Sequence, residues 1–258
     1  MTQALTVFVT GASAGFGKAI AKRLVKEGHN VIASGRRTER LNELHHELGD
    51  ALLPLSLDMQ DIKTIRDLPS SLPEKWQDID VLINNAGLAL GMDPAQNADP
   101  DEWETMITTN ISGLVEITRA FLPTMIKRNT GYIMSIGSTA GTYPYKGGNV
   151  YGATKAFVSQ FMQNLRTDLL GTKIRVTNIE PGLCGGSEFS QVRLKDNEKA
   201  NAVYQGTQPL TPNDIAETIA WLLKLPAHMN VNRMELMPVC QASGGLAVHR
   251  ELSQRENQ

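Results

Sequence analysis

The sequence contains few cysteines. Only Cys184 and Cys240 occur in 258 residues, which is too few for the disulfide framework of a small secreted protein. Their spacing also does not match a metal-ligand motif. We therefore expect no bound metal and a reduced, cytoplasmic protein.

The sequence also lacks blocks of like charge and long apolar runs. Its 25 basic and 27 acidic residues give a formal net charge of −2. Because the basic residues are scattered, no broad surface for nucleic acid or acidic membrane is predicted. The apolar run from Leu5 to Val9 is too short for a signal peptide or a membrane helix. An anionic ligand must therefore be held by a local cluster of basic side chains.

Short β-branched runs alternate with amphipathic segments, which is typical of strand and crossover-helix units around a parallel sheet. The predicted strands are Thr6–Thr10, Asn30–Ser34, Ala51–Leu57, Val81–Asn84, Tyr132–Ile136, Ile174–Ile179 and Met234–Met237. The predicted helices are Gly17–Glu27, Thr38–Leu48, Asp61–Leu72, Asp101–Arg128, Val150–Leu169 and Pro212–Leu223. Right-handed crossovers place helices on both faces of the sheet. The predicted fold class is α/β, a three-layer doubly wound parallel sheet of about seven strands, or Rossmann fold.

No linker or repeat divides the chain, so we expect a single dinucleotide-binding catalytic domain over residues 1–258. The segment from about 182 to 209 has a glycine pair, mixed charge and little periodicity. It is longer than most structureless connections, and such segments are typically functional lids or mobile. We expect a substrate lid there, followed later by a weakly patterned C-terminal tail from about residue 239.

A glycine-rich turn follows the first predicted strand. Gly11, Gly15 and Gly17 let the backbone turn tightly and approach a pyrophosphate, which then faces the free N–H groups of the next helix. The spacing G-x-x-x-G-x-G differs from the familiar G-x-G-x-x-G pattern. The alternative is a tight turn without a ligand.

The same turn also matches the G-x-S-x-G pattern of a hydrolase, with Ser13 as the nucleophile. Only one strand precedes it, so the upstream loop that completes an oxyanion hole is missing. None of the five histidines has a local context that marks it as the base. The hydrolase interpretation is therefore weaker than the nucleotide loop.

The second predicted strand ends in Arg36 and Arg37, where NAD-binding proteins carry an acidic residue that binds the ribose. An arginine at this place accommodates the 2′-phosphate of NADP. The alternative is a solvated helix start. Asp58 and the run Asn84-Asn85-Ala86-Gly87 follow the third and fourth strands, at the sheet edge where such folds bind ligands. A helix cap and an ordinary turn explain them equally well.

Tyr151 and Lys155 are four residues apart and share one helix face. Two opposite charges about 4 Å apart attract by about 4 kcal/mol at an effective dielectric constant of about 20. This attraction predicts a lowered phenol pKa, which suits a general acid or base. Ser138 lies just past the fifth strand, where a loop return brings its hydroxyl beside Tyr151. Asn110 lies in a long helix, where a polar side chain at a kink holds water.

Taken together, these motifs resemble the short-chain dehydrogenase/reductase family over nearly the whole chain. The resemblance is carried by Thr10-Gly11-x-x-x-Gly15-x-Gly17, Asn84-Asn85-Ala86-Gly87, Asn110, Ser138, Tyr151-x-x-x-Lys155 and Pro181-Gly182. The stretches Asn85–Met92, Gly148–Phe157 and Ile179–Leu183 are similar to NADP-dependent 3-hydroxy acid dehydrogenases that act on serine. Sulfoacetaldehyde reductases, which form isethionate, are a neighbouring branch that the sequence does not separate.

The resemblance implies a role for each matching residue. Tyr151 exchanges a proton with the substrate oxygen, Ser138 polarises that oxygen, and Lys155 lowers the Tyr151 pKa and binds the nicotinamide ribose. Asn110 fixes a water molecule beside Lys155. The residues that hold NADP(H) are then Gly11, Ser13, Gly15, Phe16, Gly17, Arg36, Arg37, Asp58, Asn85, Gly87, Tyr151, Lys155, Pro181 and Gly182. Such enzymes are usually homotetramers, with Asp101–Arg128 and Val150–Leu169 between subunits.

A small anionic substrate, such as a hydroxy acid, an aldehyde acid or a sulfonate, needs a positive group near the reacting carbon. Arg193 in the lid segment is the candidate, because a guanidinium binds carboxylate or sulfonate bidentately; the alternative is a solvated loop arginine. Tyr145, Gln191 and Gln241 are weaker candidates, and Ser138 and Tyr151 complete the substrate site.

Two classes of function remain. The first is an NADP(H)-dependent oxidoreductase that interconverts a small anionic hydroxy compound and its carbonyl. The second is a non-catalytic nucleotide sensor on the same fold. A sensor does not need Tyr151, Lys155, Ser138 and Asn110 together, so their joint presence favours the enzyme.

Overall fold

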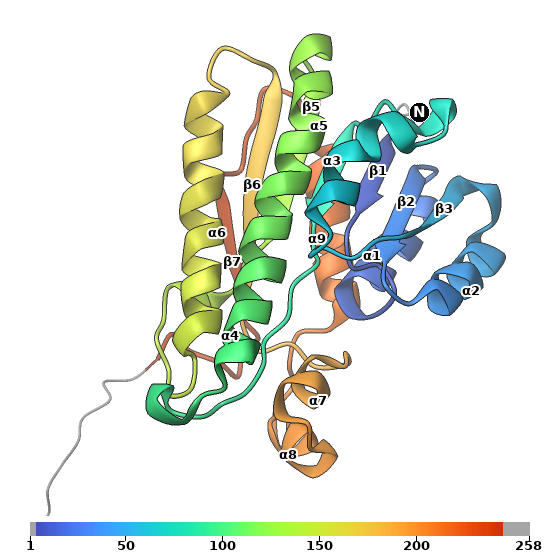
Figure 1. Cartoon of the computed structure of the whole chain (residues 1–258). Helices are drawn as coiled ribbons and strands as arrows, with labels where there is room; N and C mark the ends of the chain where they lie inside the picture. The colour runs from blue at the N-terminus through green and yellow to red at the C-terminus, as the bar shows by residue number, and fades with distance from the viewer. Residues whose placement is uncertain (1–3, 245–258) are drawn as a thin grey trace, which may run out of the picture.

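The computed structural model describes residues 4–244. Within this range seven strands form one all-parallel sheet, in the order β3-β2-β1-β4-β5-β6-β7 (Figure 1). The strands are β1 (Thr6–Val9), β2 (Asn30–Gly35), β3 (Leu52–Ser56), β4 (Val81–Asn84), β5 (Gly131–Ile136), β6 (Ile174–Pro181) and β7 (Arg233–Leu236). The predicted doubly wound α/β fold is confirmed.

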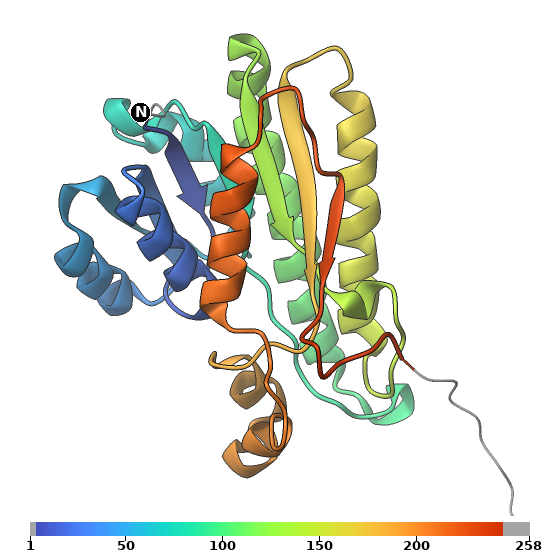
Figure 2. The same ribbon diagram turned by 180° about the vertical axis from the view of Figure 1, so that it is seen from behind.

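Helices cover both faces of the sheet. The helices are α1 (Gly15–Lys26), α2 (Thr38–Leu48), α3 (Ile62–Ser71), α4 (Pro100–Ile107), α5 (Leu114–Arg128), α6 (Asn149–Asp168), α7 (Phe189–Leu194), α8 (Asn197–Ala202) and α9 (Pro212–Lys224). Helices α3, α5 and α6 pack on one face, and Figure 2 shows α1 and α9 on the opposite face. Two apolar cores therefore lie on either side of the sheet.

The two cores explain why the strands read as continuous apolar runs. Val7 and Val9 of β1 face α1, whereas Phe8 between them faces the other way and packs against Phe121 of α5 at a ring distance of 5.2 Å. Because alternate residues of a strand point to opposite faces, a strand covered on both sides must be apolar throughout.

The expected helix Asp101–Arg128 is divided. Its central turn, Thr108–Gly113, is a π-helix between α4 and α5. Asn110 lies in this turn, and its buried amide bonds both backbone groups of Leu88. A wide turn of this kind is frequent where a side chain has a special partner, so the kink expected at Asn110 takes the form of a π-turn.

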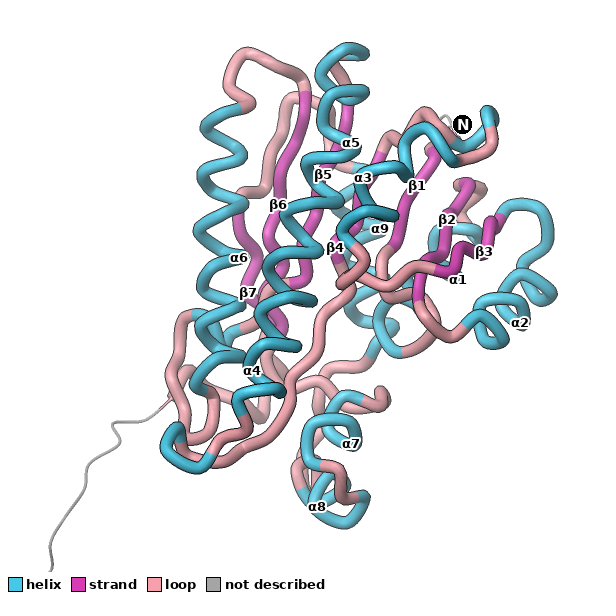
Figure 3. The backbone as a smooth tube through the Cα atoms, viewed as in Figure 1, coloured by secondary structure: helices cyan, strands magenta, loops and turns pink. Residues whose placement is uncertain are grey.

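The segment 182–209 is more regular than its sequence pattern indicates, because it contains the short helices α7 and α8. Asp196 caps α8 by accepting from the backbone N–H groups of Glu198 and Lys199. Both helices sit beyond the carboxyl ends of the strands (Figure 3). Of the predicted tail from about residue 239, only residues up to 244 are described; the rest lies outside the described range.

The strand order reverses between β1 and β4, which lie side by side although β2 and β3 intervene in the sequence. Ligands of open α/β sheets bind in the crevice outside such a switch point. No helix in residues 4–244 has the length and apolar content needed to cross a membrane.

Candidate active site

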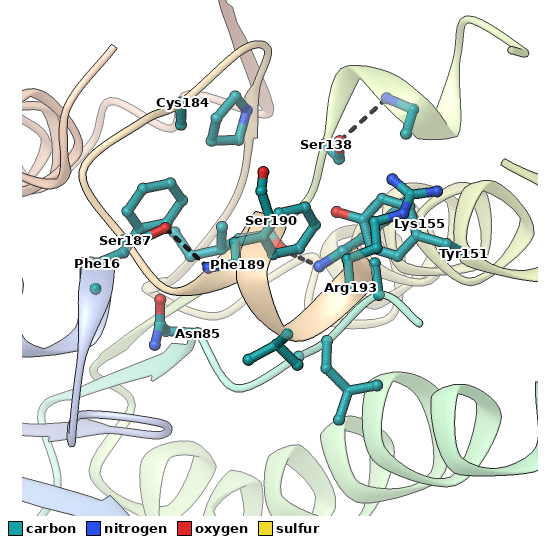
Figure 4. A pocket seen from close by; sticks show the side chains of 18 of the residues that line it. Phe16, Asn85, Ser138, Tyr151, Lys155, Cys184, Ser187, Phe189, Ser190 and Arg193 are labelled. Atoms are coloured by element: carbon teal, nitrogen blue, oxygen red, sulfur yellow. Dashed lines mark hydrogen bonds between the residues drawn. The ribbon is translucent and has the colours of Figure 1, made fainter. Parts of the chain in front are cut away.

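A cavity of about 840 Å³ opens at this switch point. Its lining combines the loops after β1, β2, β3, β4, β5 and β6 with α7 (Figure 4). Of the residues predicted from the sequence, the cavity brings together Gly11, Ser13, Gly15, Phe16, Arg36, Arg37, Asp58, Asn85, Gly87, Ser138, Tyr145, Tyr151, Lys155, Pro181, Gly182, Arg193 and Gln241.

Three predicted residues do not line this cavity. Gly17 and Asn110 lie behind it, and Gln191 borders a smaller hollow between α1, α2 and the lid segment. The large cavity is lined by Phe189, Ser190, Val192, Arg193 and Leu194 of α7, which leaves Gln191 as the residue of this helix outside it. Gln191 therefore points the other way and is exposed, so its prediction as a rim residue of the substrate site does not match its position.

The glycine turn after β1 packs tightly against the loop after β4. The Asn85 amide donates to the carbonyl oxygens of Thr10 and Gly11 at 2.8 and 3.2 Å. Gly11 has a φ of +68°, and a Cβ there would lie 2.9 Å from the Cα of Ala86. A Cβ at Gly17 would lie 2.6 Å from the Asn85 amide nitrogen and would also meet the Gly11 carbonyl. Side chains at Gly11 or Gly17 would therefore collide with neighbouring atoms of the turn. We call this backbone turn, residues 11–17, the glycine cradle.

The end of β2 carries positive charge beside this cradle. Arg36 and Arg37 both line the cavity, and the Nε of Arg37 donates to Ser13 Oγ at 3.2 Å. The two residues before them, Ser34 and Gly35, carry no carboxylate that would bind a ribose diol. The cradle and the two guanidinium groups fit a dinucleotide with a 2′-phosphate.

Tyr151 and Lys155 start α6 on its buried side. The Lys155 Nζ donates to the Ile136 carbonyl oxygen at 2.7 Å and lies 5.9 Å from the centre of the Tyr151 ring. Gly87 leaves room for this ammonium, because a Cβ there would come within 3.4 Å of Nζ and 3.3 Å of the Asn110 Oδ1. Burial lowers the pKa of Lys155 to about 8.

The phenol does not behave as the local charge argument predicts. Burial raises the pKa of Tyr151 to about 12, while the Ser138 side chain and the Arg193 charge pull it down. Desolvation disfavours the charged form of any acid, and here it outweighs nearby cations. Without a further positive charge in the cavity, the Tyr151 phenol therefore stays protonated at neutral pH.

Ser138 is held by the short loop after β5. Its Oγ accepts from the backbone N–H of Ala140 at 3.1 Å. Behind the loop, the buried Glu180 carboxylate binds Arg233 at 2.5 Å, and Arg233 in turn donates to Thr142 Oγ1 at 2.6 Å. This polar chain ties the Ser138 loop to β6 and β7.

Asn110 is already engaged within the protein. Its Oδ1 accepts from the Leu88 N–H at 2.9 Å, and its Nδ2 donates to the Leu88 carbonyl and to Thr154 Oγ1. Asn110 thus clamps the loop after β4, and the water molecule expected beside Lys155 stays a prediction.

Arg193 reaches into the cavity from α7. Its guanidinium carbon lies 5.3 Å from the ring centres of both Tyr145 and Tyr151. Its Nε and Nη2 donate to the carbonyl oxygens of Gly91 and Gly147 at 3.1 and 3.2 Å. The Nη1 group is left without a partner among the described residues. Gln241 instead accepts from the Leu183 N–H at 2.6 Å, so it positions the chain after Pro181-Gly182.

Several residues of the cavity carry no signal in the sequence. Phe189 packs 5.8 Å from the Tyr151 ring, and Ser187 lies against Gly15. Glu188 binds Arg37 and Arg40. No motif marks these three residues, because they reach the site only through the path of the lid segment. Among residues 4–244 no cluster of three potential metal ligands is present.

Comparison with known proteins agrees with this geometry. Residues 5–198 match the family model of the short-chain dehydrogenases. The chain is 59% identical over 247 residues to an NADP-dependent 3-hydroxy acid dehydrogenase of Salmonella typhi, covering 95% of this chain and 100% of that protein. It is 49% identical to a serine 3-dehydrogenase of Rhizobium radiobacter, covering 95% of this chain and 98% of that protein.

Solved structures give the same assignment. A closed form of serine dehydrogenase complexed with NADP⁺ superimposes with a TM-score of 0.93 at 59% identity, covering 95% of this chain and 99% of that one. A serine dehydrogenase from Escherichia coli gives a TM-score of 0.81 at 54% identity, covering 92% of this chain and 99% of the other. The chain therefore belongs to the short-chain dehydrogenase family.

Proposed function

We propose that this protein is an NADP(H)-dependent dehydrogenase that interconverts small 3-hydroxy acids, serine among them, and their carbonyl compounds. The observation that carries the proposal is the Arg193 guanidinium, 5.3 Å from the ring centre of Tyr151. It places a fixed positive charge beside the acid/base candidate, as a small anionic substrate requires. Relatives that match over their full length carry the corresponding names.

Different residues of the site bind the cofactor and transfer the proton. When bound, the cofactor supplies or accepts a hydride. The glycine cradle, which Asn85 braces through the carbonyl oxygens of Thr10 and Gly11, would hold its pyrophosphate, and Arg36 and Arg37 would bind its 2′-phosphate. Burial keeps the pKa of Tyr151 at about 12, so the phenol carries the proton that a developing alkoxide takes. Ser138 donates a hydrogen bond to the same oxygen.

Lys155 supplies a positive charge at neutral pH. Its pKa of about 8 leaves most of the population protonated at pH 7. An ammonium beside the phenol stabilises the phenolate that forms once the proton has left. Phe189 and the other lining residues of α7 form one wall of the cavity, and closing of this wall over a bound substrate would exclude water and strengthen these interactions.

We also propose that residues 1–258 act as one catalytic domain with a lid at about 182–209, and that the protein is a cytoplasmic homotetramer. Cys184 and Cys240 are both free thiols, as in proteins of reducing compartments. Ile107 of α4 and Phe157 of α6 are large apolar side chains exposed on helices expected to meet a partner subunit.

The experiment compares L-serine, 3-hydroxypropionate, malonic semialdehyde and sulfoacetaldehyde as substrates of the wild-type protein and of Arg193→Ala. We expect turnover of the carboxylates with NADP(H). We also expect a rise in KM of at least about ten-fold in the variant, because a charge-assisted bond to the substrate is lost. A neutral aldehyde of similar size is the control and keeps its KM.

Other outcomes contradict the proposal. Faster turnover of sulfoacetaldehyde than of any carboxylate makes the protein a sulfoacetaldehyde reductase. An unchanged KM in Arg193→Ala assigns the substrate anion to another residue. If the protein neither oxidises nor reduces any of these compounds with NADP(H) or with NAD(H), a nucleotide-binding protein without catalysis is favoured.

A further inference from the structure

A carboxylate attaches the lid segment to the far side of the cofactor cleft. Glu188, the residue before α7, accepts from the Nη1 of Arg37 at 2.6 Å and from the Nη1 of Arg40 at 2.7 Å. Arg37 precedes α2, and Arg40 lies in its first turn. The two ion pairs hold the pKa of Glu188 below its usual range, so this carboxylate is charged at neutral pH.

Arg37 is therefore shared between two anions once a phosphorylated cofactor binds. Its Nε already donates to Ser13, and its Nη1 donates to Glu188. Only Nη2 has no partner among the described residues. A guanidinium grips a phosphate best with two parallel N–H groups, and neither edge of Arg37 offers a fully free pair while Glu188 stays in place.

We propose that Glu188 competes with the 2′-phosphate of NADP(H) for Arg37 and so determines how strongly the enzyme prefers the phosphorylated cofactor. This inference rests on the proposed cofactor. A phosphate monoester carries a charge of about −1.5 to −2 near neutral pH, the same sign as Glu188. The lid carboxylate thus acts as an internal counter-ion for the arginines in the cofactor-free protein and opposes the phosphate that replaces it.

The competition connects the adenosine end of the cleft to the lid. Glu188 stands at one end of α7 and Arg193 near the other. The Arg193 end keeps its bonds to Gly91 and Gly147, and Lys195 beyond it pairs with Glu102 at 2.6 Å. Displacement of Glu188 therefore frees only the end of the lid that lies over the phosphates, while Arg193 stays in the substrate site.

Binding of two small ligands tests the proposal without catalysis. Adenosine 2′,5′-bisphosphate and adenosine 5′-monophosphate differ only in the 2′-phosphate. Calorimetric titration of Glu188→Gln is expected to show about five-fold tighter binding of the bisphosphate than wild type, since removing a like charge several ångströms away is worth about 1 kcal/mol. Binding of the monophosphate is expected to change by less than about two-fold, because its single phosphate is expected on the glycine cradle and does not compete with Glu188 for Arg37.

Glu47→Gln is the matched control. Glu47 lies on the same helix α2 and pairs with Lys22 at 2.6 Å, so the variant removes the same charge without touching the lid. We expect its affinities for both ligands to equal those of wild type. Glu188 is 38% exposed, so glutamine fits at this position without repacking.

A second readout follows the lid itself. Chymotrypsin cleavage after Phe189, at the end of the lid that Glu188 holds, is expected to speed up when the bisphosphate is added to wild type, and to be fast in Glu188→Gln with or without ligand. Unchanged or weaker bisphosphate binding in Glu188→Gln overturns the inference, because Glu188 then positions Arg37 instead of competing for it. Slower cleavage of the liganded wild type overturns it as well.

The two proposals fail in different ways. If wild type binds both ligands equally, the preference for NADP(H) itself is wrong. If wild type prefers the bisphosphate and Glu188→Gln does not increase that preference, only the role of Glu188 is wrong.

Discussion

At the scale of single residues, the site depends on two ionisable groups whose pKa values burial moves in opposite directions. Tyr151 is pushed up to about 12 and Lys155 down to about 8. Both shifts favour the neutral form. Without a ligand, the Tyr151 phenol is therefore neutral, and the neighbouring Lys155 ammonium loses its proton more easily than a free lysine does. Ser138 and Arg193 are the partners that lower the phenol pKa.

Replacing the phenol tests its role as the acid. Tyr151→Phe keeps the ring that packs on Phe189 and removes only the hydroxyl. We expect kcat to fall by about 10³-fold, within the usual range for general acid–base catalysis, while the Kd for NADPH changes by less than about three-fold. Steady-state kinetics and calorimetry measure the two quantities. Near-normal turnover would exclude the phenol as proton donor.

Replacing the ammonium tests the cost of its burial. With a folded-state pKa of about 8 against 10.5 for a free lysine, the unfolded chain binds more protons than the native protein between these values. The wild type therefore gains stability as the pH rises from 8 to about 10.5. Below pH 8 both states are protonated, and the full cost of burying the charge is present.

Lys155→Met removes that cost. We expect the variant to be inactive when assayed with NADP(H). Without cofactor, we expect it to be more stable than wild type at pH 7, by an amount on the order of 2 kcal/mol. The advantage should shrink between pH 8 and 10.5. Thermal unfolding at pH 7 and pH 10 measures this difference, and an advantage that stays constant between the two pH values would contradict it.

At the scale of elements, the cradle depends on how closely α1 approaches the loops after β1 and β4. Gly17 allows this approach, because its missing Cβ leaves room for the Gly11 carbonyl and the Asn85 amide. Gly28 at the other end of α1 has a φ of +89°, but a Cβ there would have no neighbour within 4 Å. Gly17 thus allows close packing at the start of α1, whereas Gly28 terminates the helix.

The two glycines provide a paired prediction. Gly17→Ala must push the cradle open, so we expect the Kd for NADPH to rise at least about ten-fold, the equivalent of a lost hydrogen bond or two. Gly28→Ala is the control, and it lowers stability by about 1 to 2 kcal/mol through backbone strain alone. Its Kd for NADPH stays at the wild-type value. Equal effects on cofactor binding would show that the approach of α1 is not what shapes the cradle.

At the scale of the whole molecule, apolar side chains remain uncovered on α6. Phe157 is 39% exposed and stacks on Phe161 with ring centres 6.0 Å apart. Ile107 at the end of α4 is 44% exposed. Exposed apolar groups that lie together, as Phe157 does with Phe161, mark association sites more often than isolated ones do.

The proposed tetramer gives a prediction at this scale. Phe157→Glu places a charge where an apolar partner surface is expected, so sedimentation should show dissociation into smaller species. Leu170→Glu is the control, because Leu170 is exposed beyond the end of α6, at 77%, and away from Phe157. A monomeric wild type, or an intact tetramer in Phe157→Glu, would contradict the assignment of this face.

The sequence alone determined what depends on local pattern. Strand positions, the glycine turn, the arginines after β2 and the helix that pairs Tyr151 with Lys155 all follow from short-range spacing, and the crossover rule then brings their strand ends to one edge. Only the tertiary structure decided what depends on burial and on contacts between distant segments. Desolvation reversed the expected pKa shift of Tyr151, the turn of α7 carried Gln191 away from the cavity, and the path of the lid placed Glu188 on Arg37. No spacing rule contains such information, because burial and long-range contacts arise only when the whole chain has packed.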